Sequence, residues 1–342
     1  MKDKNVEISV IMSVYNTSKE YLDIAVNSII NQTFCNFEFI IINDGSSEEC
    51  SNNILHYKDP RIRLIINERN IGLTKSLNKG LKLAQGKYIA RMDADDYSYP
   101  QRLELQYNYL ESHPEIDILG CWVKEGKKTK KSCGCVTSDW RYARMLFDNV
   151  GIYHPTAFIK TKFLKDHGLL YNEKILKAQD FELWTRCLEF GRMYVLPRVL
   201  LYYRIHEQQI SKCMLEEQQC YNYAIREQLL SKLNLELEEA ERQQFIYINV
   251  PALSAMQFEQ FIQKIIKAND NYLIFNQDIL RYELNTKWII HMIKAPGKRK
   301  KDYFSPQYGY HWLNFKYYIY MIIVALRKYD LLKRHREKLV NE

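Results

Sequence analysis

The chain has 342 residues, of which 46% are hydrophobic and 26% are charged, and this length suits one large or two ordinary domains with a substantial core. Aromatic residues make up 13% of the chain and there are only 12 glycines and 8 prolines, which excludes a disordered, collagen-like or linker-like protein. The net charge of +8 is concentrated in residues 294–342, which contain 12 Lys and Arg and 4 Asp and Glu, and the rest of the chain has no net charge. We therefore expect a basic C-terminal segment and no nucleic-acid-binding face.

The cysteines and the N-terminal residues indicate a reducing compartment. The 8 cysteines are too sparse for a disulfide scaffold, and no CxxC pair with a nearby His completes a zinc site. The first residues run directly into an apolar strand pattern without the pattern of a signal peptide. No window reaches the roughly 20 apolar residues of a spanning helix. We expect a protein of the cytosol.

Strand and helix patterns alternate through the first third of the chain. Short apolar runs rich in β-branched residues predict strands at residues 7–14, 37–42, 61–66, 87–92 and 117–123. Helical spacing predicts helices at residues 20–30 and 73–84, and two more after Ser46–Ser47 and after Pro100. Strands separated by helices predict right-handed βαβ units and a doubly wound, mostly parallel sheet of the α/β class.

The remaining two thirds of the chain change character along their length. Residues 124–140 predict a loop or short hairpin, and a helix and a strand follow at residues 180–190 and 199–203. From residue 212 the pattern is almost wholly helical, so we expect one domain over residues 1–211 and a helical, basic region over residues 212–342. The apolar segment 317–326 is flanked by cations, and it either lies in a membrane interface or packs as a helix with a solvated basic end.

Three polar clusters follow predicted strands. Tyr15 and Asn16 come after the first strand, Asp44 after the second, and Asp93 and Asp95 after the fourth. Ligands of doubly wound sheets bind beyond the carboxyl ends of the strands. The sequence therefore predicts a binding site at this edge of the sheet.

The aspartates at the end of the fourth strand are candidates for a cation site. Asp93, Asp95 and Asp96 lie so close together that their charges repel unless a cation or hydrogen-bond donors compensate. Carboxylate oxygens suit Mg²⁺ or Mn²⁺, which also bind substrate phosphates. The alternative is a solvated acidic turn.

Two further carboxylates and two histidines have functional and structural interpretations. Asp44 could accept hydrogen bonds from a nucleobase or a ribose, or belong to a turn that caps a helix. Asp180 begins a predicted helix and could be a general base or only its N-cap. His154 and His206 are each structural hydrogen-bonding groups or parts of a site, and His206 would complete a metal or diphosphate site if the chain folds back over the cleft.

The ordered motifs carry a resemblance to a known family. In chain order the sequence contains VEISVIMSVYN, IINDGSS, NERNIGLTKSLNKGL, GKYIARMDADDYSYPQRL, AQDFELWTR and YRIHEQQIS. Together they resemble family 2 glycosyltransferases of the GT-A fold, notably bacterial lipooligosaccharide β-1,3-N-acetylglucosaminyltransferases and exopolysaccharide transferases. The resemblance covers residues 6–212 and extends more weakly to the C-terminus.

This resemblance implies roles for the residues at the strand ends. Tyr15, Asn16 and Asp44 would contact the nucleoside of a UDP-sugar. Asp93 and Asp95 match the DxD pair of the family, with Asp95 as a ligand of Mn²⁺ or Mg²⁺ and Asp93 nearer the ribose.

It also implies roles for residues outside these strand ends. Asp180 matches the catalytic base, and His206 resembles the residue that closes over the diphosphate or the metal. Leu77 stands where many relatives have Arg before Asn78, which leaves Lys75 as the expected diphosphate partner, with Asn78 beside it in the donor site.

The activity implied is an inverting transfer from a UDP-sugar to a hydroxyl of a cell-surface glycan, such as lipooligosaccharide, O-antigen, capsule or exopolysaccharide, giving a β linkage. The enzyme would act at the inner face of the cytoplasmic membrane, held there peripherally by its basic C-terminus. Two alternatives are a sugar nucleotidyltransferase, which usually needs a Gly-rich basic loop that the first strand–helix turn lacks, and a non-catalytic membrane-bound relative, against which the intact Asp93, Asp95 and Asp180 argue.

Overall fold

The computed structural model describes residues 6–130, 137–206, 215–246 and 253–294. The chain forms two compact units, the first made of Met1–Leu235 with Tyr272–Ile279 and the second of Glu236–Asn271 with Leu280–Glu342. Helix α9 (Leu215–Ser231) lies beyond residue 211, where the sequence suggested a boundary, and it belongs to the first unit.

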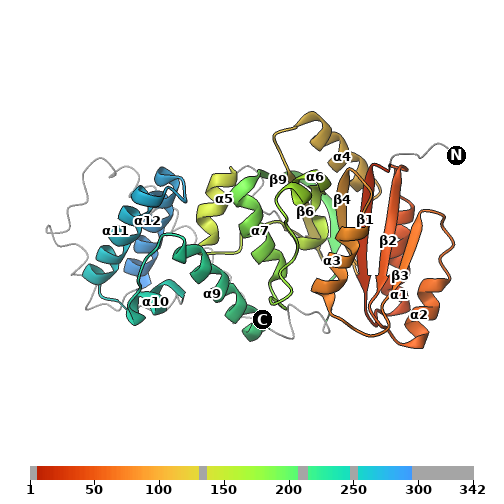
Figure 1. The fold of residues 1–342 in the computed structure, drawn as a ribbon, viewed down its shortest axis with the longest axis horizontal. Helices are drawn as coiled ribbons and strands as arrows, with labels where there is room; N and C mark the ends of the chain where they lie inside the picture. Colours follow the sequence, from red (N-terminus) through yellow and green to blue (C-terminus); the bar gives the residue numbers. More distant parts are fainter. Residues whose placement is uncertain (1–5, 131–136, 207–214, 247–252, 295–342) are drawn as a thin grey trace, which may run out of the picture. The chain divides into compact units, whose positions relative to one another are not determined.

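The first unit is built on one mixed sheet with the strand order β3-β2-β1-β4-β8-β6-β9-β5, to which β7 is added beside β6 (Figure 1). The strands are β1 Ile8–Val14, β2 Phe37–Asn43, β3 Ile62–Ile66, β4 Tyr88–Asp93, β5 Tyr97–Ser98, β6 Ile118–Glu125, β7 Lys128–Lys130, β8 Phe158–Lys160 and β9 Met193–Tyr203. The strands β3, β2, β1 and β4 are parallel, so the predicted α/β architecture is confirmed. The short strand β8, which the sequence analysis did not predict, runs antiparallel between β4 and β6.

The helices of the first unit are α1 Lys19–Ile30, α2 Glu48–Leu55, α3 Leu73–Leu83, α4 Arg102–Ser112, α5 Ser138–Met145, the 3-10 helix η1 His154–Thr156, α6 Thr161–Asp166, α7 Gln179–Phe190 and α9. The sequence leaves Ser46 and Ser47 as candidates for the cap of α2, and the side chain of Ser47 is the one that accepts a hydrogen bond from the Cys50 N–H. Of the loop or short hairpin predicted over residues 124–140, residues 124–130 form a hairpin in which Gly126 has a positive φ of 56°. Residues 131–136 lie outside the described residues, and the prediction is wrong from Ser138, where α5 begins.

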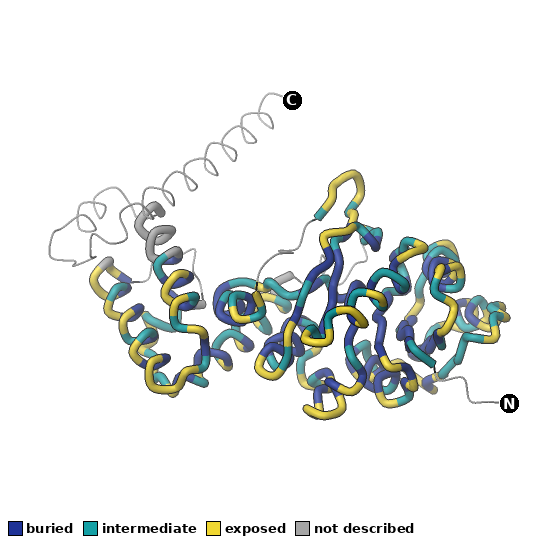
Figure 2. Tube along the Cα trace, turned by 90° about the horizontal axis from the view of Figure 1, so that it is seen from above, coloured by how far each residue is buried: buried dark blue, intermediate teal, exposed yellow. Residues whose placement is uncertain are grey.

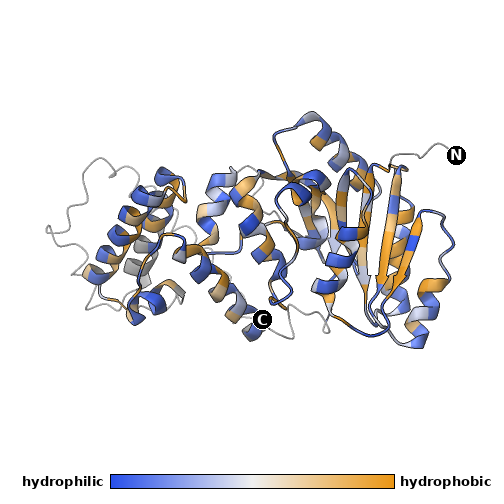
Figure 3. Ribbon diagram, in the orientation of Figure 1, coloured by the Kyte–Doolittle hydropathy of each residue, from blue (hydrophilic) through white to orange (hydrophobic). Residues whose placement is uncertain are grey.

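Alternate residues of the parallel strands face two helical layers. Val10, Met12 and Ile41 share one core with the apolar sides of α1, α2 and α4. On the opposite face α3 packs close to the sheet, and the absence of a side chain at Gly80 allows this approach. A Cβ on Gly80 would lie only 2.6 Å from the Cγ2 of Ile11. The strands β1 and β2 are strongly hydrophobic along their length (Figure 3), as strands covered on both faces must be. The residues of β1, β2 and β4 are mostly buried (Figure 2), whereas those of the edge strand β3 are only partly buried or exposed.

The register aligns the carboxyl ends of these strands. Val14 pairs with Asn43, Asn43 pairs with Ile66, and Ser13 pairs with Asp93. The polar residues that follow β1, β2 and β4 therefore leave the sheet at one edge.

The second unit contains α10 Glu239–Ile246 and most of α11 Ala255–Tyr272 and α12 Gln277–Lys294. The last residue of α11, Tyr272, and the first three residues of α12 belong to the first unit. Its buried side chains include Phe245, Phe258, Phe261, Ile262 and Ile265, which agrees with the helical pattern expected after residue 212. Within the described residues, no helix has the length and apolar character required to cross a membrane. The segment 317–326, for which we expect either an interfacial or a packed helix, lies outside the described residues.

Candidate active site

Three carboxylates gather where β4 ends. Ligand atoms of Asp93, Asp95 and Asp96 all lie within 4.8 Å of one another, the only such acidic or metal-ligating group found in the described part of the chain. Asp93 ends β4, and Asp95 and Asp96 fall in the turn that leads to β5. The predicted clustering of these side chains is confirmed.

Asp96 is the most deeply buried of the three. Its Oδ1 accepts a hydrogen bond of 2.9 Å from the backbone N–H of Arg204, while its buried Oδ2 has no hydrogen-bond partner among the described residues. Burial raises the pKa of Asp96 well above its usual range, and the charges of Asp93 and Asp95 raise it further. An acidic cluster with an unpartnered buried oxygen is chemically suited to a divalent cation.

A buried arginine, which the sequence analysis missed, lies beside the cluster. Arg91 of β4 is 5% exposed and forms an ion pair with Asp93. Burial raises the pKa of Asp93, and the positive charge of Arg91 opposes that rise. On the core side Arg102 donates a 2.8 Å hydrogen bond to the Arg91 carbonyl, and burial lowers the pKa of Arg102 to about 10. Position within an apolar strand is the one signal that could have singled out Arg91.

The chain does fold back over this edge through β9. The Nε2 of His206 lies 2.8 Å from the Oδ2 of Asp95, and the Nε of Arg204 donates a 2.8 Å hydrogen bond to the Asp95 carbonyl. The Arg204 guanidinium also lies 4.5 Å from the centre of the Tyr21 ring. The structure thus brings His206 to the acidic cluster, as the resemblance implied.

Asp44 organises the loop at the end of β3. It is 1% exposed, its Oδ1 accepts hydrogen bonds from Asn67 Nδ2 (2.9 Å) and the Ile71 N–H (3.0 Å), and its Oδ2 accepts one from the Gly72 N–H (2.9 Å). Three donors therefore hold the carboxylate, and its contact with a nucleoside stays a prediction.

Asn16 links the first two loops of this edge. It has a positive φ of 49°, its N–H donates to Ser46 Oγ (3.1 Å), and its Oδ1 accepts from the Ser47 N–H (2.8 Å). Its neighbour Tyr15 is 52% exposed, and Lys75 is exposed on the first turns of α3. Their contacts with a donor also stay predictions.

Asp180 lies in the first turn of α7 and is not its N-cap. The capping position is Ala178, in the left-handed conformation at φ 62°, so the alternative reading of Asp180 as a cap is wrong. Burial raises the pKa of Asp180, while the backbone N–H of Phe181 and the charge of Arg91 lower it, and the charge of Asp93 adds to the rise. The charges of Arg91 and Asp93 therefore reach Asp180, and Arg91 lines one small cavity with Tyr171 and with Leu183 of α7. That Asp180 and the acidic cluster form one catalytic site stays a prediction.

Asn78 and His154 both contact Tyr171 in the segment before α7. The His154 Nε2 lies 2.6 Å from the Tyr171 hydroxyl, and burial lowers the pKa of this imidazole well below its usual range. Since His154 is buried and neutral, its structural interpretation fits best. Asn78 bonds to the backbone of Tyr171 and not to another residue of the expected donor site.

Comparisons with known proteins identify the family of the chain. Residues 9–166 match the model of glycosyl transferase family 2. The O-antigen biosynthesis glycosyltransferase WbnJ of Escherichia coli is 35% identical over 64% of this chain and 88% of WbnJ. The amylovoran biosynthesis glycosyltransferase AmsE of Erwinia amylovora is 31% identical over 68% of this chain and 86% of AmsE. The chain belongs to the family 2 glycosyltransferases.

A solved structure shows the same fold. Residues 1–349 of TarS from S. aureus, in complex with UDP-GlcNAc, align with a TM-score of 0.57 and 20% identity over 84% of this chain and 90% of that chain. The expected GT-A fold with a helical C-terminal extension is confirmed.

Proposed function

We propose that this glycosyltransferase moves a sugar, such as GlcNAc or galactose, from a UDP-sugar to a hydroxyl of a cell-surface glycan with inversion, giving a β linkage. The observation that supports this best is the cluster of Asp93, Asp95 and Asp96 at the end of β4, whose buried Asp96 Oδ2 has no hydrogen-bond partner among the described residues. The charge of Asp93 also acts on Asp180, the candidate base. The names of WbnJ and AmsE favour an O-antigen or exopolysaccharide acceptor, and the TarS complex favours a UDP-sugar donor.

The acidic cluster fits a divalent cation, Mn²⁺ or Mg²⁺. Asp95 and His206 would hold it, with Asp93 beside the ribose, and the unpartnered Oδ2 of Asp96 supports a positive charge nearby. When bound, the cation offsets the negative charge that develops on the leaving diphosphate.

The chain's own residues supply the rest of the reaction. Asp180 takes the proton of the acceptor hydroxyl while the hydroxyl oxygen attacks the anomeric carbon of the donor sugar. The bond from that carbon to the diphosphate breaks on the opposite face, and UDP leaves. A well-placed base contributes roughly 10²–10⁴ in rate. Burial raises the pKa of both Asp93 and Asp180, and the charge of Arg91 opposes both rises. Arg91 therefore favours the ionised form of Asp180, which is the form that a general base requires.

The proposed location is the inner face of the cytoplasmic membrane. Residues 294–342 carry the whole net charge of +8, and Lys and Arg near an anionic leaflet contribute about 1 kcal/mol each. A glycolipid acceptor would be presented at the same surface.

The substitution Asp180→Asn tests the function. We expect transfer to be abolished, because the amide cannot accept the proton. Transfer is measured as acceptor-dependent UDP release with Mn²⁺ across a panel of nucleotide sugars. UDP affinity should stay within about tenfold of the wild type. Full activity in this variant would refute the base assignment. A wild-type chain that forms a nucleotide sugar from a sugar phosphate, or that releases no UDP with any donor, would instead favour a nucleotidyltransferase or a non-catalytic relative.

A further inference from the structure

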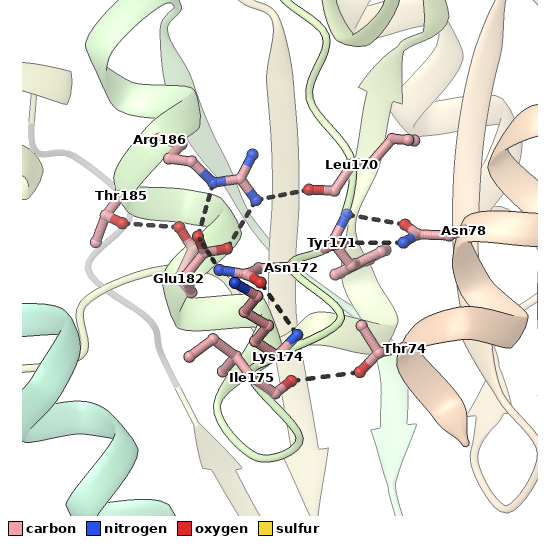
Figure 4. Close-up of polar contacts among 10 residues, drawn as sticks. All are labelled: Thr74, Asn78, Leu170, Tyr171, Asn172, Lys174, Ile175, Glu182, Thr185 and Arg186. Atoms are coloured by element: carbon pink, nitrogen blue, oxygen red, sulfur yellow. Dashed lines mark hydrogen bonds and ion pairs between the residues drawn. The ribbon is translucent and has the colours of Figure 1, made fainter. Parts of the chain in front are cut away.

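The loop of residues 170–178 leads into α7, which carries Asp180, and polar side chains from both sides hold this loop (Figure 4). From α3, Asn78 bonds to Tyr171 and Thr74 Oγ1 donates to the Ile175 carbonyl at 3.4 Å. From α7, Arg186 donates to the Leu170 carbonyl at 2.6 Å. The loop is therefore attached both to the helix that packs on the parallel strands and to the helix of the candidate base.

Asn78 makes the most complete of these attachments. Its Nδ2 donates to the Tyr171 carbonyl (2.9 Å) and to Glu173 Oε1 (3.2 Å), and its Oδ1 accepts from the Tyr171 N–H (2.9 Å). The residue is 3% exposed. Because the NH₂ group and the carbonyl oxygen of the amide are both used, Asn78 binds residues 93 and 95 positions away instead of presenting its amide to a substrate.

The α7 side of the loop is equally well defined. Arg186 binds the carboxylate of Glu182 with both Nε (2.8 Å) and Nη2 (2.7 Å) while it bonds to Leu170. Bidentate arginine–carboxylate pairs fix the plane of both groups. The first two turns of α7 and the start of the loop are thereby held together.

The backbone before Asp180 is consistent with a tightly held loop. Ala178 has a φ of 62° and is 3% exposed. A residue other than glycine keeps this conformation only when the surrounding structure determines it. Since Asp180 is two residues further on, its position depends on the contacts that hold this turn.

We propose that Asn78 is a positioning residue for Asp180, tying α3, on the donor side of the site, to the loop that sets the start of α7. The inference rests on the proposed role of Asp180 as base and gives Asn78 a function other than the donor contact that the resemblance implied. A displacement of about 1 Å at a catalytic group can cost roughly 10²-fold in rate, so a small movement of this loop is enough to be measured.

The experiment compares Asn78→Ala with two controls in the full chain. Lys82→Ala changes an exposed side chain on the same helix. Ser9→Ala removes a buried hydroxyl at the other end of the sheet, which accepts from the Gly86 N–H at 2.8 Å, and it controls for general destabilisation. We measure kcat and the donor KM for transfer, and hydrogen–deuterium exchange of the peptide spanning residues 170–178.

For Asn78→Ala we expect kcat to fall roughly tenfold or more with the donor KM within about twofold, and exchange in residues 170–178 to increase. Neither control should change these three quantities by more than about twofold. The variant Asn78→Asp keeps the acceptor for the Tyr171 N–H but places a buried carboxylate oxygen against the Tyr171 carbonyl and Glu173 Oε1. We expect it to lose at least as much activity as Asn78→Ala.

Two outcomes would overturn the proposal: unchanged exchange in residues 170–178, or a raised donor KM with unchanged kcat, which would identify Asn78 as a donor contact. If the wild-type chain transfers no sugar, the proposed function fails, and the role of Asn78 in positioning a base fails with it. Exchange in residues 170–178 then still shows whether Asn78 holds this loop.

Discussion

Asp44 and Asp96 are both buried carboxylates at the same sheet edge, yet their surroundings are opposite. Asp44 accepts hydrogen bonds from three donors, whereas Asp96 accepts one and leaves an oxygen unpartnered among the described residues. A buried charge without compensating donors destabilises the fold. At the scale of single residues, ionisation of Asp96 is therefore unfavourable in the folded protein, and a bound cation would offset the negative charge.

The pH dependence of stability tests this interpretation. Burial raises the folded-state pKa of Asp96, so its stabilising contribution is present at acidic pH and is lost as the pH rises through that pKa. In the absence of metal, Asp96→Asn should raise the free energy of unfolding at pH 7 by about 1 kcal/mol or more, and the gain should shrink toward pH 4. Thermal unfolding measures both effects.

Asp166→Asn, at an exposed ion pair of α6 with Lys162, is the matched control, because a surface substitution should stay within about 0.5 kcal/mol. A neutral-pH Tm for Asp96→Asn at or below that of the wild type would contradict the assignment.

At the scale of elements, the turn after β2 shows how a loop is built around one residue. Gly45 has a φ of 66°, and a Cβ there would lie 2.3 Å from the backbone carbonyl carbon of Arg69. Asp44, directly before it, holds Ile71 and Gly72 through their N–H groups. The close approach of the two loops requires a residue without a side chain at position 45.

Gly45→Ala should therefore destabilise the protein by about 2 kcal/mol or more, because it adds a backbone clash to the strain of a positive φ. Urea unfolding of the full chain measures the loss. The control is Gly126→Ala, since Gly126 also has a positive φ, of 56°, but has open space around its Cβ position. An equal loss in both variants would show that the clash is relieved by a shift of the loop.

At the scale of the whole molecule, the net charge is concentrated in one part of the sequence. The basic excess of +8 lies in residues 294–342 and the remainder is neutral. An electrostatic attachment to an anionic surface would therefore reside in one segment, apart from the carboxylates of the site. Such an attachment weakens with added salt.

Removal of residues 315–342 should move the protein from the membrane fraction to the soluble fraction. With vesicles, the full chain should co-sediment with anionic but not with neutral lipid, and 0.5 M salt should reduce the bound fraction. Neutralising substitutions of Arg327 and Lys328 in the full chain separate charge from the loss of apolar residues. An unchanged distribution after truncation would support a packed C-terminal helix.

The sequence by itself determined the strands and helices of the parallel half, the pair of serines that precedes α2 and the edge at which the candidate site lies. These features follow from local patterns of apolar and capping residues, which act over a few positions. Only the tertiary structure decided the rest. The three-residue strand β8 forms because β4 and β6 lie on either side of it. Arg91 forms an ion pair with Asp93, and Asn78 bonds to Tyr171, 93 positions away. Such contacts depend on which side chains the packed sheet brings together, and no periodicity along the chain records them.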